Sequence, residues 1–167
     1  MAGVDVRQAS HEDIDACIEL YGLVADERRW IGAEPPIDRG KLEAHLRRFI
    51  DADDAALVVA ELDGGVIGWT VLSFVDAATV TLGMGVAKPW RGRGVGSALM
   101  ASAIDWATAK GAEQMRVEVF PHNDAAIALY RRLGFRDEEI LVGQFPRQSG
   151  EVWDAIVMVR PITGDSN

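Results

Sequence analysis

Apolar residues recur along this chain with two spacings, and the spacings predict strands and helices in a fixed order. Residues 4–8 alternate apolar with polar positions, which predicts a first strand. Ser10 and Asp13 resemble a capping box, which predicts that a helix begins there. The apolar residues that follow have helical spacing: Ile14, Cys17, Ile18, Tyr21 and Val24. Residues 41–50 predict a second, shorter helix.

The middle and end of the chain predict a sheet with further helices. Apolar runs at 55–62 and 66–75 flank Asp63-Gly64-Gly65, a strong hairpin signal. The further predicted strands are 78–87, 114–120, about 138–142 and about 151–159, and the further helices are 94–110 and 123–134. We therefore expect an α/β (α+β) fold. Its sheet is mixed and mostly antiparallel, with about seven strands and about four helices on both faces.

Length and composition restrict the class of protein. The 167 residues fit a single domain over 1–162, followed by a tail over 163–167 that we expect to be disordered. A net charge of −9 argues against binding to nucleic acid or to an anionic membrane. The single cysteine, Cys17, is expected in the core, and no residues have metal-ligand spacing. Without a signal-like or membrane-spanning apolar run, we expect a cytoplasmic protein.

The stretch 86–97, "VAKPWRGRGVGS", carries the clearest chemical signal. Gly92, Gly94 and Gly96 allow a ligand to approach the backbone closely, and the predicted helix that follows begins with unpaired N–H groups. Such a helix start binds anions, and Arg91 and Arg93 add positive charge. The pattern predicts a phosphate-binding loop.

Three common catalytic or nucleotide-binding motifs do not fit this loop. A dinucleotide fingerprint needs a third glycine where Ser97 stands, and a mononucleotide loop needs a lysine before Ser97. The G-x-S-x-G elbow of serine hydrolases is also absent from the sequence.

The loop resembles motif A, R/Q-x-x-G-x-G/A, of the GNAT superfamily of acyl-coenzyme-A-dependent N-acyltransferases. Residues 123–135, "NDAAIALYRRLGF", are similar to its motif B, N-x-x-A-x-x-L-Y-x-x-x-G-F. The resemblance implies the GNAT fold, splayed between the fourth and fifth strands. It also implies a set of residues that bind acetyl-CoA: Met84, Gly85, Val86, Arg91, Gly92, Arg93, Gly94, Val95, Gly96, Ser97, Asn123 and Tyr130.

Two residues are candidates for proton transfer. By resemblance, Tyr130 gives a proton to the departing sulfur, whereas an ordinary tyrosine in a helix packed on the core is the alternative. Many family members carry a glutamate as base where this chain has Thr81. Glu118, five residues before Asn123, stands where ribosomal-protein N-terminal acetyltransferases have their base glutamate. A water relay or a purely structural Glu118 remains open.

The resulting prediction is an enzyme that transfers an acetyl group from acetyl-CoA to a primary amine of a small molecule, by direct attack through a tetrahedral intermediate. The acceptor, such as an amino acid or an antibiotic-like amine, is expected between residues 28–36 and 141–154, with Trp30, Glu34 and Phe145 as lining. A protein N-terminal acetyltransferase and a non-catalytic acyl-CoA sensor are the alternatives. The resemblance also leaves a homodimer open.

Overall fold

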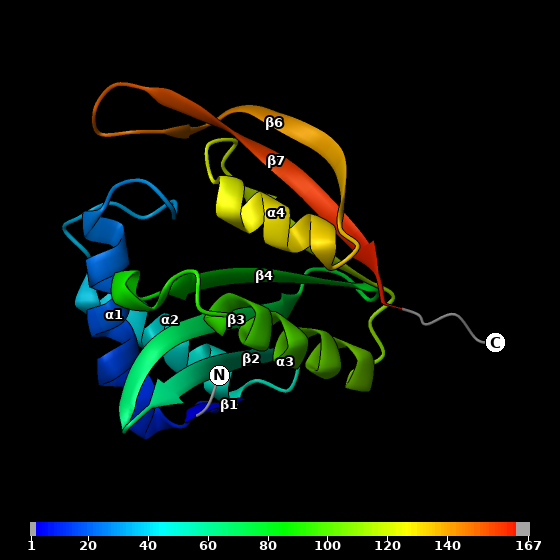
Figure 1. The fold of residues 1–167 in the computed structure, drawn as a ribbon. Coiled ribbons are helices and arrows are strands. Elements are labelled where there is room, and N and C mark those ends of the chain that lie inside the picture. The colour runs from blue at the N-terminus through cyan, green and yellow to red at the C-terminus, as the bar shows by residue number, and fades with distance from the viewer. Residues whose placement is uncertain (1–2, 163–167) are drawn as a thin grey trace.

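The computed structural model describes residues 3–162, and they form a seven-stranded sheet with helices on both faces (Figure 1). The strands are β1 (Val4–Gln8), β2 (Ala55–Leu62), β3 (Gly65–Phe74), β4 (Thr79–Val86), β5 (Gln114–Val119), β6 (Arg136–Pro146) and β7 (Val152–Pro161). The α-helices are α1 (Ile14–Asp26), α2 (Arg39–Asp51), α3 (Val95–Ala109) and α4 (Asp124–Arg132). Short 3₁₀ turns cover His11–Asp13 and Lys88–Trp90. The predicted fold class is confirmed.

The strands lie in the order β1-β2-β3-β4-β5-β7-β6, and every neighbouring pair is antiparallel except β4 with β5. The predicted hairpin joins β2 to β3. Asp63 and Gly64 have φ of 50° and 82°, the left-handed backbone that a two-residue hairpin turn requires.

Each face of the sheet has its own apolar core. One core packs α1 and α2 on the sheet and contains Cys17, which is buried as expected, together with Trp69. The other packs α3 and α4 on the opposite face, and it contains the predicted inward face of α3: Val95, Leu99, Ala103, Trp106 and Ala107. The sheet therefore separates the two layers, and a ligand contacts both only where the sheet opens.

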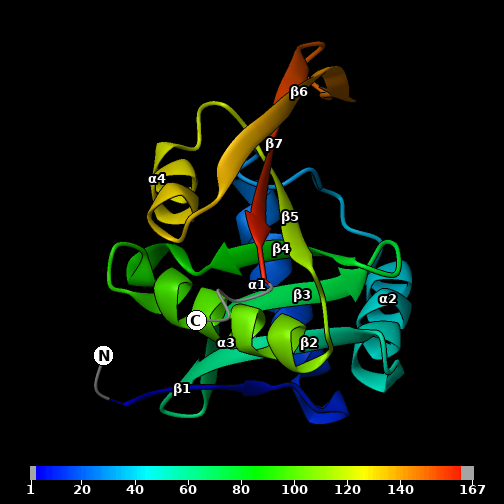
Figure 2. The ribbon, with the colours of Figure 1, turned by 90° about the vertical axis from the view of Figure 1, so that its right-hand side faces the viewer.

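The sheet opens between β4 and β5, as the resemblance implies. The parallel pairing joins Thr79–Leu82 to residues 114–117 and then stops, although β4 continues to Val86 and β5 to Val119. Figure 2 shows β5, β7 and β6 running steeply across the direction of β2, β3 and β4. The carboxyl-terminal halves of β4 and β5 thus form the walls of a gap.

Element ends differ from the prediction by a few residues. Helix α2 begins at Arg39 rather than at position 41, because the side chain of Asp38 caps it by accepting a hydrogen bond from the Lys41 N–H at 3.0 Å. Strand β6 extends over Arg136–Pro146, well beyond 138–142, because pairing with β7 supports a polar, exposed sequence. The expected tail, 163–167, lies outside the described residues.

No helix within residues 3–162 is long and apolar enough to cross a membrane.

Candidate active site

The predicted phosphate loop lies at the start of α3. Gly94 is the residue before the helix, with φ of 86°, and Gly92 has φ of 72°. L-residues with a side chain rarely adopt this conformation, so glycine is required at both positions. The Cβ that Gly92 and Gly94 lack would meet open space. The backbone N–H groups at the start of α3 are therefore accessible to an anion.

Arg91 anchors this loop to α1. Its Nε donates to the Val86 carbonyl at 2.9 Å, and its two terminal nitrogens donate to the Glu27 carboxylate at 2.7 and 2.6 Å. Hydrogen bonding from Arg91 holds the pKa of Glu27 below its ordinary value of 4.5. The Arg91 guanidinium is thus already occupied, and Arg93 lies over the ring of Trp90, 5.1 Å from its centroid.

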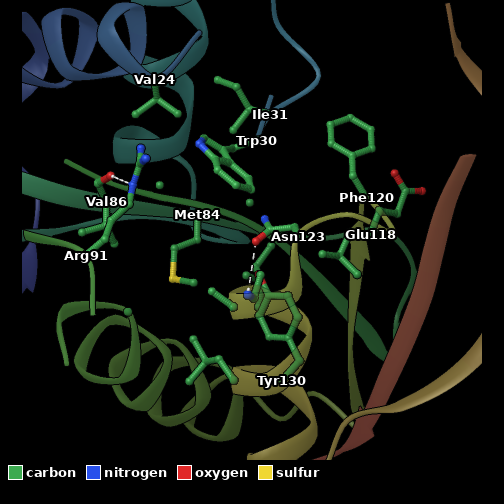
Figure 3. A pocket seen from close by; sticks show the side chains of 18 of the residues that line it. Val24, Trp30, Ile31, Met84, Val86, Arg91, Glu118, Phe120, Asn123 and Tyr130 are labelled. Atoms are coloured by element: carbon green, nitrogen blue, oxygen red, sulfur yellow. Dashed lines mark hydrogen bonds between the residues drawn. The ribbon is translucent and has the colours of Figure 1, made fainter. Parts of the chain in front are cut away.

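A cavity of about 710 Å³ runs from this loop through the gap between β4 and β5 (Figure 3). Most of the predicted site residues line it: Met84, Gly85, Val86, Arg91, Gly92, Gly94, Gly96, Ser97, Glu118, Asn123 and Tyr130. Arg93 and Val95 do not. Val95 is 1% exposed and its side chain belongs to the core, so only its backbone faces the loop.

Helix α4 supplies two of these residues. Asn123 caps the helix, with its Oδ1 accepting from the Ala126 N–H at 3.2 Å. Tyr130 extends from the same helix toward Asn123 (Figure 3) and is 6% exposed. Burial raises the pKa of the Tyr130 hydroxyl to about 12, so the phenol is protonated at neutral pH.

A tryptophan from β3 packs closely against the backbone of strand β4. Trp69 pairs with Gly85, and a Cβ at Gly85 would lie 2.1 Å from Cη2 of the indole. Glycine is required here by this close contact within the sheet. Gly83, by contrast, has its nearest such neighbour, Cγ2 of Val71, at 3.4 Å.

The other end of the cavity carries the predicted base. Glu118 lies on β5 and Phe120 directly after its end (Figure 3), and Glu118 forms an ion pair with Arg116 at 3.1 Å. Thr81 also lines the cavity, and its hydroxyl donates to the Arg116 carbonyl at 3.2 Å. Among the cavity-lining residues that the structure describes, Glu118 is the single carboxylate. Within residues 3–162 no cluster of three His, Cys, Asp or Glu side chains is arranged to hold a metal ion.

The turn between β6 and β7 forms hydrogen bonds to the segment after α1, residues 27–37, and the strands beside the turn contribute Phe145 and Ala155 to the cavity lining. The Gln148 N–H donates to Glu34 at 2.9 Å, and its side-chain amide donates to the Pro35 carbonyl at 2.9 Å. Arg147 donates to the Gly32 carbonyl at 3.1 Å. In Figure 1 this turn lies above the segment between α1 and α2. We call this arrangement the roof.

Of the three residues expected to line the acceptor site, two line the cavity and the third belongs to the roof. Trp30 and Phe145 line the cavity, whereas Glu34 does not and instead pairs with Arg147 at 3.4 Å. Ile31 and Gly32 also line the cavity and lie within the expected segment 28–36, but neither residue type indicates a ligand contact by itself. The small residues of α4 that make room for the cavity are visible in the sequence as Ala125, Ala126 and Ala128.

The family model "Acetyltransferase (GNAT) family" matches residues 19–135, which include both motifs and the two strands beside the gap. The chain belongs to this family. The prediction of an acyltransferase is thereby confirmed at the level of the family, and the remaining comparisons concern the fold.

Solved structures share the fold of this GNAT chain over nearly its whole length. A GNAT superfamily phosphinothricin acetyltransferase from Sinorhizobium meliloti, in complex with acetyl-CoA, is 24% identical with a TM-score of 0.84, covering 95% of this chain and 88% of that one. YncA from Salmonella typhimurium, solved with its cofactor acetyl-CoA, is 22% identical with a TM-score of 0.84, covering 99% and 97%. A ribosomal-protein-alanine N-acetyltransferase from Brucella melitensis is 24% identical with a TM-score of 0.83, covering 94% and 99%.

Proposed function

We propose that this protein transfers the acetyl group of acetyl-CoA to the primary amine of a small molecule. One observation carries the proposal: a single cavity connects the glycine loop of α3, the gap between β4 and β5, and the Glu118 carboxylate. A long thioester cosubstrate and an amine can approach each other only through such a continuous space.

The residues present fit acetyl-CoA, which supplies an activated acetyl group as a thioester. Backbone N–H groups over residues 92–97 are accessible to the pyrophosphate, and the hydroxyl of Ser97 is a further donor. Arg91 contributes through its backbone and by anchoring the loop, since Glu27 occupies its guanidinium. The exposed edge of Met84–Val86, beyond the pairing with β5, is available to the pantetheine arm, with Asn123 across the gap.

The proposed chemistry assigns one proton transfer to each of two side chains. Glu118 takes a proton from the incoming ammonium group, directly or through water, and leaves a nucleophilic amine. The nitrogen then forms a bond to the acetyl carbon and gives a tetrahedral intermediate, whose nitrogen loses its second proton to solvent. The intermediate collapses to the amide as the carbon–sulfur bond breaks. Tyr130, protonated and buried beside the gap, gives its proton to the departing sulfur. Proton exchange with solvent then returns Glu118 and Tyr130 to their starting protonation states. In this proposal a backbone N–H near Met84 stabilises the developing oxyanion.

The roof favours a small molecule over a protein terminus. Hydrogen bonds from Arg147 and Gln148 join the β6–β7 turn to the segment after α1, so a polypeptide would have to break them to enter from that side. A protein N-terminal acetyltransferase is the second candidate, favoured by the position of Glu118 five residues before Asn123.

Amine-dependent thiol release tests this proposal. Purified protein is mixed with acetyl-CoA and a panel of amines, amino acids and short peptides, and free coenzyme A thiol is measured. We expect release that depends on a small amine. Stabilisation by acetyl-CoA without release for any acceptor would indicate the sensor instead, and release only with peptides would indicate the protein acetyltransferase.

We propose a cytoplasmic location as well, since acetyl-CoA is available there, and we propose residues 1–162 as one functional domain. The described strands, from Val4 to Pro161, join one sheet, which supports the domain proposal. The homodimer is tested by light scattering of the purified chain.

A further inference from the structure

The acceptor end of the cavity is apolar and largely aromatic. We call it the acceptor half, and it is lined by Trp30, Ile31, Gly32, Glu118, Phe120 and Phe145. The inference drawn from it rests on the proposed function, because it asks which amine that end accepts. Its walls offer rings and aliphatic groups to the body of a substrate and a single carboxylate to its nitrogen.

The aromatic side chains of this half support one another. Phe120 and Phe145 meet edge to face, with ring centroids 5.1 Å apart. His122 stacks on Phe120 at 5.6 Å and lies 6.1 Å from Trp30. The Trp30 indole also donates to Glu27 at 3.2 Å. Rings held by such contacts form a preorganised surface, so a flat apolar group binds without first ordering the wall.

Two of the cations near the acceptor half, Arg116 and Arg91, are paired with carboxylates. Arg116 pairs with Glu118, and the Arg91 guanidinium, near the glycine loop, pairs with Glu27. Among the described residues, neither arginine nor lysine is part of the acceptor half. A substrate carboxylate next to the amine would therefore enter an apolar space beside Glu118 without a counter-ion, which is unfavourable.

Two further cations lie near this half: Arg29, which is exposed, does not line the cavity and lies 4.9 Å from the centroid of the Trp30 ring, and Arg147. The Arg147 side chain is 2% exposed, and its Nε and one terminal nitrogen have no hydrogen-bond partner among residues 3–162. The guanidinium nevertheless lies over the ring of Trp153, 4.2 Å from its centroid, and pairs with Glu34. Arg147 does not line the cavity, and its guanidinium lies 5.7 Å from the centroid of the Phe120 ring, so it belongs to the wall of the acceptor half rather than to the open space.

We propose that the acceptor is a primary amine on an aromatic or bulky apolar body, with no carboxylate beside the nitrogen. Arylalkylamines fit this description, and free α-amino acids and their phosphinic analogues do not. The aromatic side chains bind the body, and Glu118 attracts the ammonium group before it takes the proton.

A matched pair of substrates tests this inference. Phenethylamine and L-phenylalanine share the ring, the carbon chain and the amine, and they differ in the carboxylate. We expect kcat/KM for phenethylamine to exceed that for L-phenylalanine by about tenfold or more. Equal or faster transfer to L-phenylalanine would overturn the inference. A larger loss of that transfer than of transfer to phenethylamine in Arg147→Met would then identify Arg147 as the partner of the carboxylate.

A variant tests the aromatic wall separately. Phe145 is half-buried on β6, so Phe145→Ala is expected to fold, which thermal denaturation checks. The preference of the wild type for phenethylamine over ethylamine should fall by about fivefold or more in this variant, with the KM for acetyl-CoA unchanged. An unaltered preference would contradict a role of the wall.

The outcomes also separate this inference from the proposed function. Transfer to L-phenylalanine or to a polyamine in preference to phenethylamine leaves the acetyltransferase intact and overturns the substrate class. Transfer to no amine, despite binding of acetyl-CoA, overturns the function itself.

Discussion

At the scale of single residues, the proposed chemistry depends on two groups that reach the cavity from different elements. Tyr130 comes from α4 and Glu118 from β5, so each is placed by its own packing. Their environments differ: burial keeps the Tyr130 phenol protonated, whereas Glu118 is partly exposed and paired with Arg116. A buried acid and a partly exposed carboxylate suit the two proton transfers assigned to them.

Tyr130→Phe removes the proposed acid and keeps the ring. We expect kcat to fall by about 10²-fold or more, because the sulfur then leaves without a proton, whereas the Kd for acetyl-CoA stays the same. Thiol release and calorimetric titration measure the two quantities. An unchanged kcat would mean that Tyr130 is only a core residue.

Glu118→Gln removes the proposed base at nearly constant size. Because glutamine does not accept a proton, we expect kcat/KM to fall and the acidic limb of its pH profile to disappear. The comparison is the profile of Glu138→Gln, an exposed substitution on β6 that should match the wild type. Identical profiles for all three proteins would exclude Glu118 as the base.

The sequence predicts the roles of the residues in motif B, but not the role of the Glu27–Arg91 ion pair. Tyr130 and Asn123 were predicted because motif B has a fixed spacing. The Glu27–Arg91 pair was not predicted, because the partners are 64 positions apart and neither has a local pattern that implies the other. Only the fold brings α1 and the glycine loop together.

At the scale of elements, the site depends on how β4 meets its neighbours and on how α1 meets α3. Trp69 of β3 lies against Gly85, and Arg91 joins the glycine loop to the end of α1. Hairpins and helices followed from local patterns such as Asp63-Gly64-Gly65. No local pattern predicts that β6 extends to Pro146, because its residues are largely exposed and pairing with β7 keeps them in a strand.

Gly85→Ala should destabilise β4. The added methyl group would lie 2.1 Å from the Trp69 ring, so the indole or the strand has to move, at a cost of about 1–3 kcal/mol in the free energy of unfolding. Gly83→Ala is the matched control, because its nearest atom lies at 3.4 Å. Chemical denaturation of both variants measures the difference, and equal stabilities would contradict this account of Gly85.

Glu27→Gln should loosen the glycine loop. It leaves Arg91 without its charged partner, so we expect a higher KM for acetyl-CoA and a loss of about 1–3 kcal/mol in the free energy of unfolding at neutral pH. Glu43→Gln is the control, since its pair with Arg47 is exposed on α2. A normal KM for acetyl-CoA in Glu27→Gln would show that the pair does not support the loop.

The stability effect of Glu27→Gln should also depend on pH. The pKa of Glu27 in the folded protein is below its ordinary 4.5, so the folded state resists protonation and the ion pair stabilises it above that pH. As pH falls through the lower folded pKa this contribution is lost. Urea denaturation at a series of pH values should show the wild type and the variant converging in acid, and a constant difference would contradict the assignment.

At the scale of the whole molecule, the sheet keeps two layers apart and joins them at one gap. The glycine loop approaches that gap from α3, and the segment after α1 approaches it from the other face (Figure 1). The motif resemblance implied a splay between the fourth and fifth strands, and the structure adds that β4 and β5 pair in parallel before they separate. From the sequence, residues 28–36 and 141–154 are expected to face each other across the acceptor, but the hydrogen bonds of the roof between residues 32–35 and 147–148 are not, because these residues have no shared pattern.

Arg147→Met tests the roof as a whole. Methionine fills similar space without the charge, and Glu34 keeps the Gln148 N–H at 2.9 Å and Arg28 at 3.9 Å as partners, so the fold should be retained at reduced stability, which thermal denaturation checks. The hydrogen bond to Gly32 is lost, and we expect a higher KM for the amine with an unchanged KM for acetyl-CoA. A rise in both constants, or in neither, would contradict a roof that acts on the acceptor alone.

The central claim is that an acetyl group passes from coenzyme A to the nitrogen of a small amine. Incubation with acetyl-CoA that carries an isotopic label in the acetyl group, followed by mass spectrometry of the amine, measures this transfer directly. The account predicts a labelled N-acetyl product that forms with the wild type and far more slowly with Tyr130→Phe. Recovery of the amine unlabelled, with acetyl-CoA bound to the protein, would contradict it.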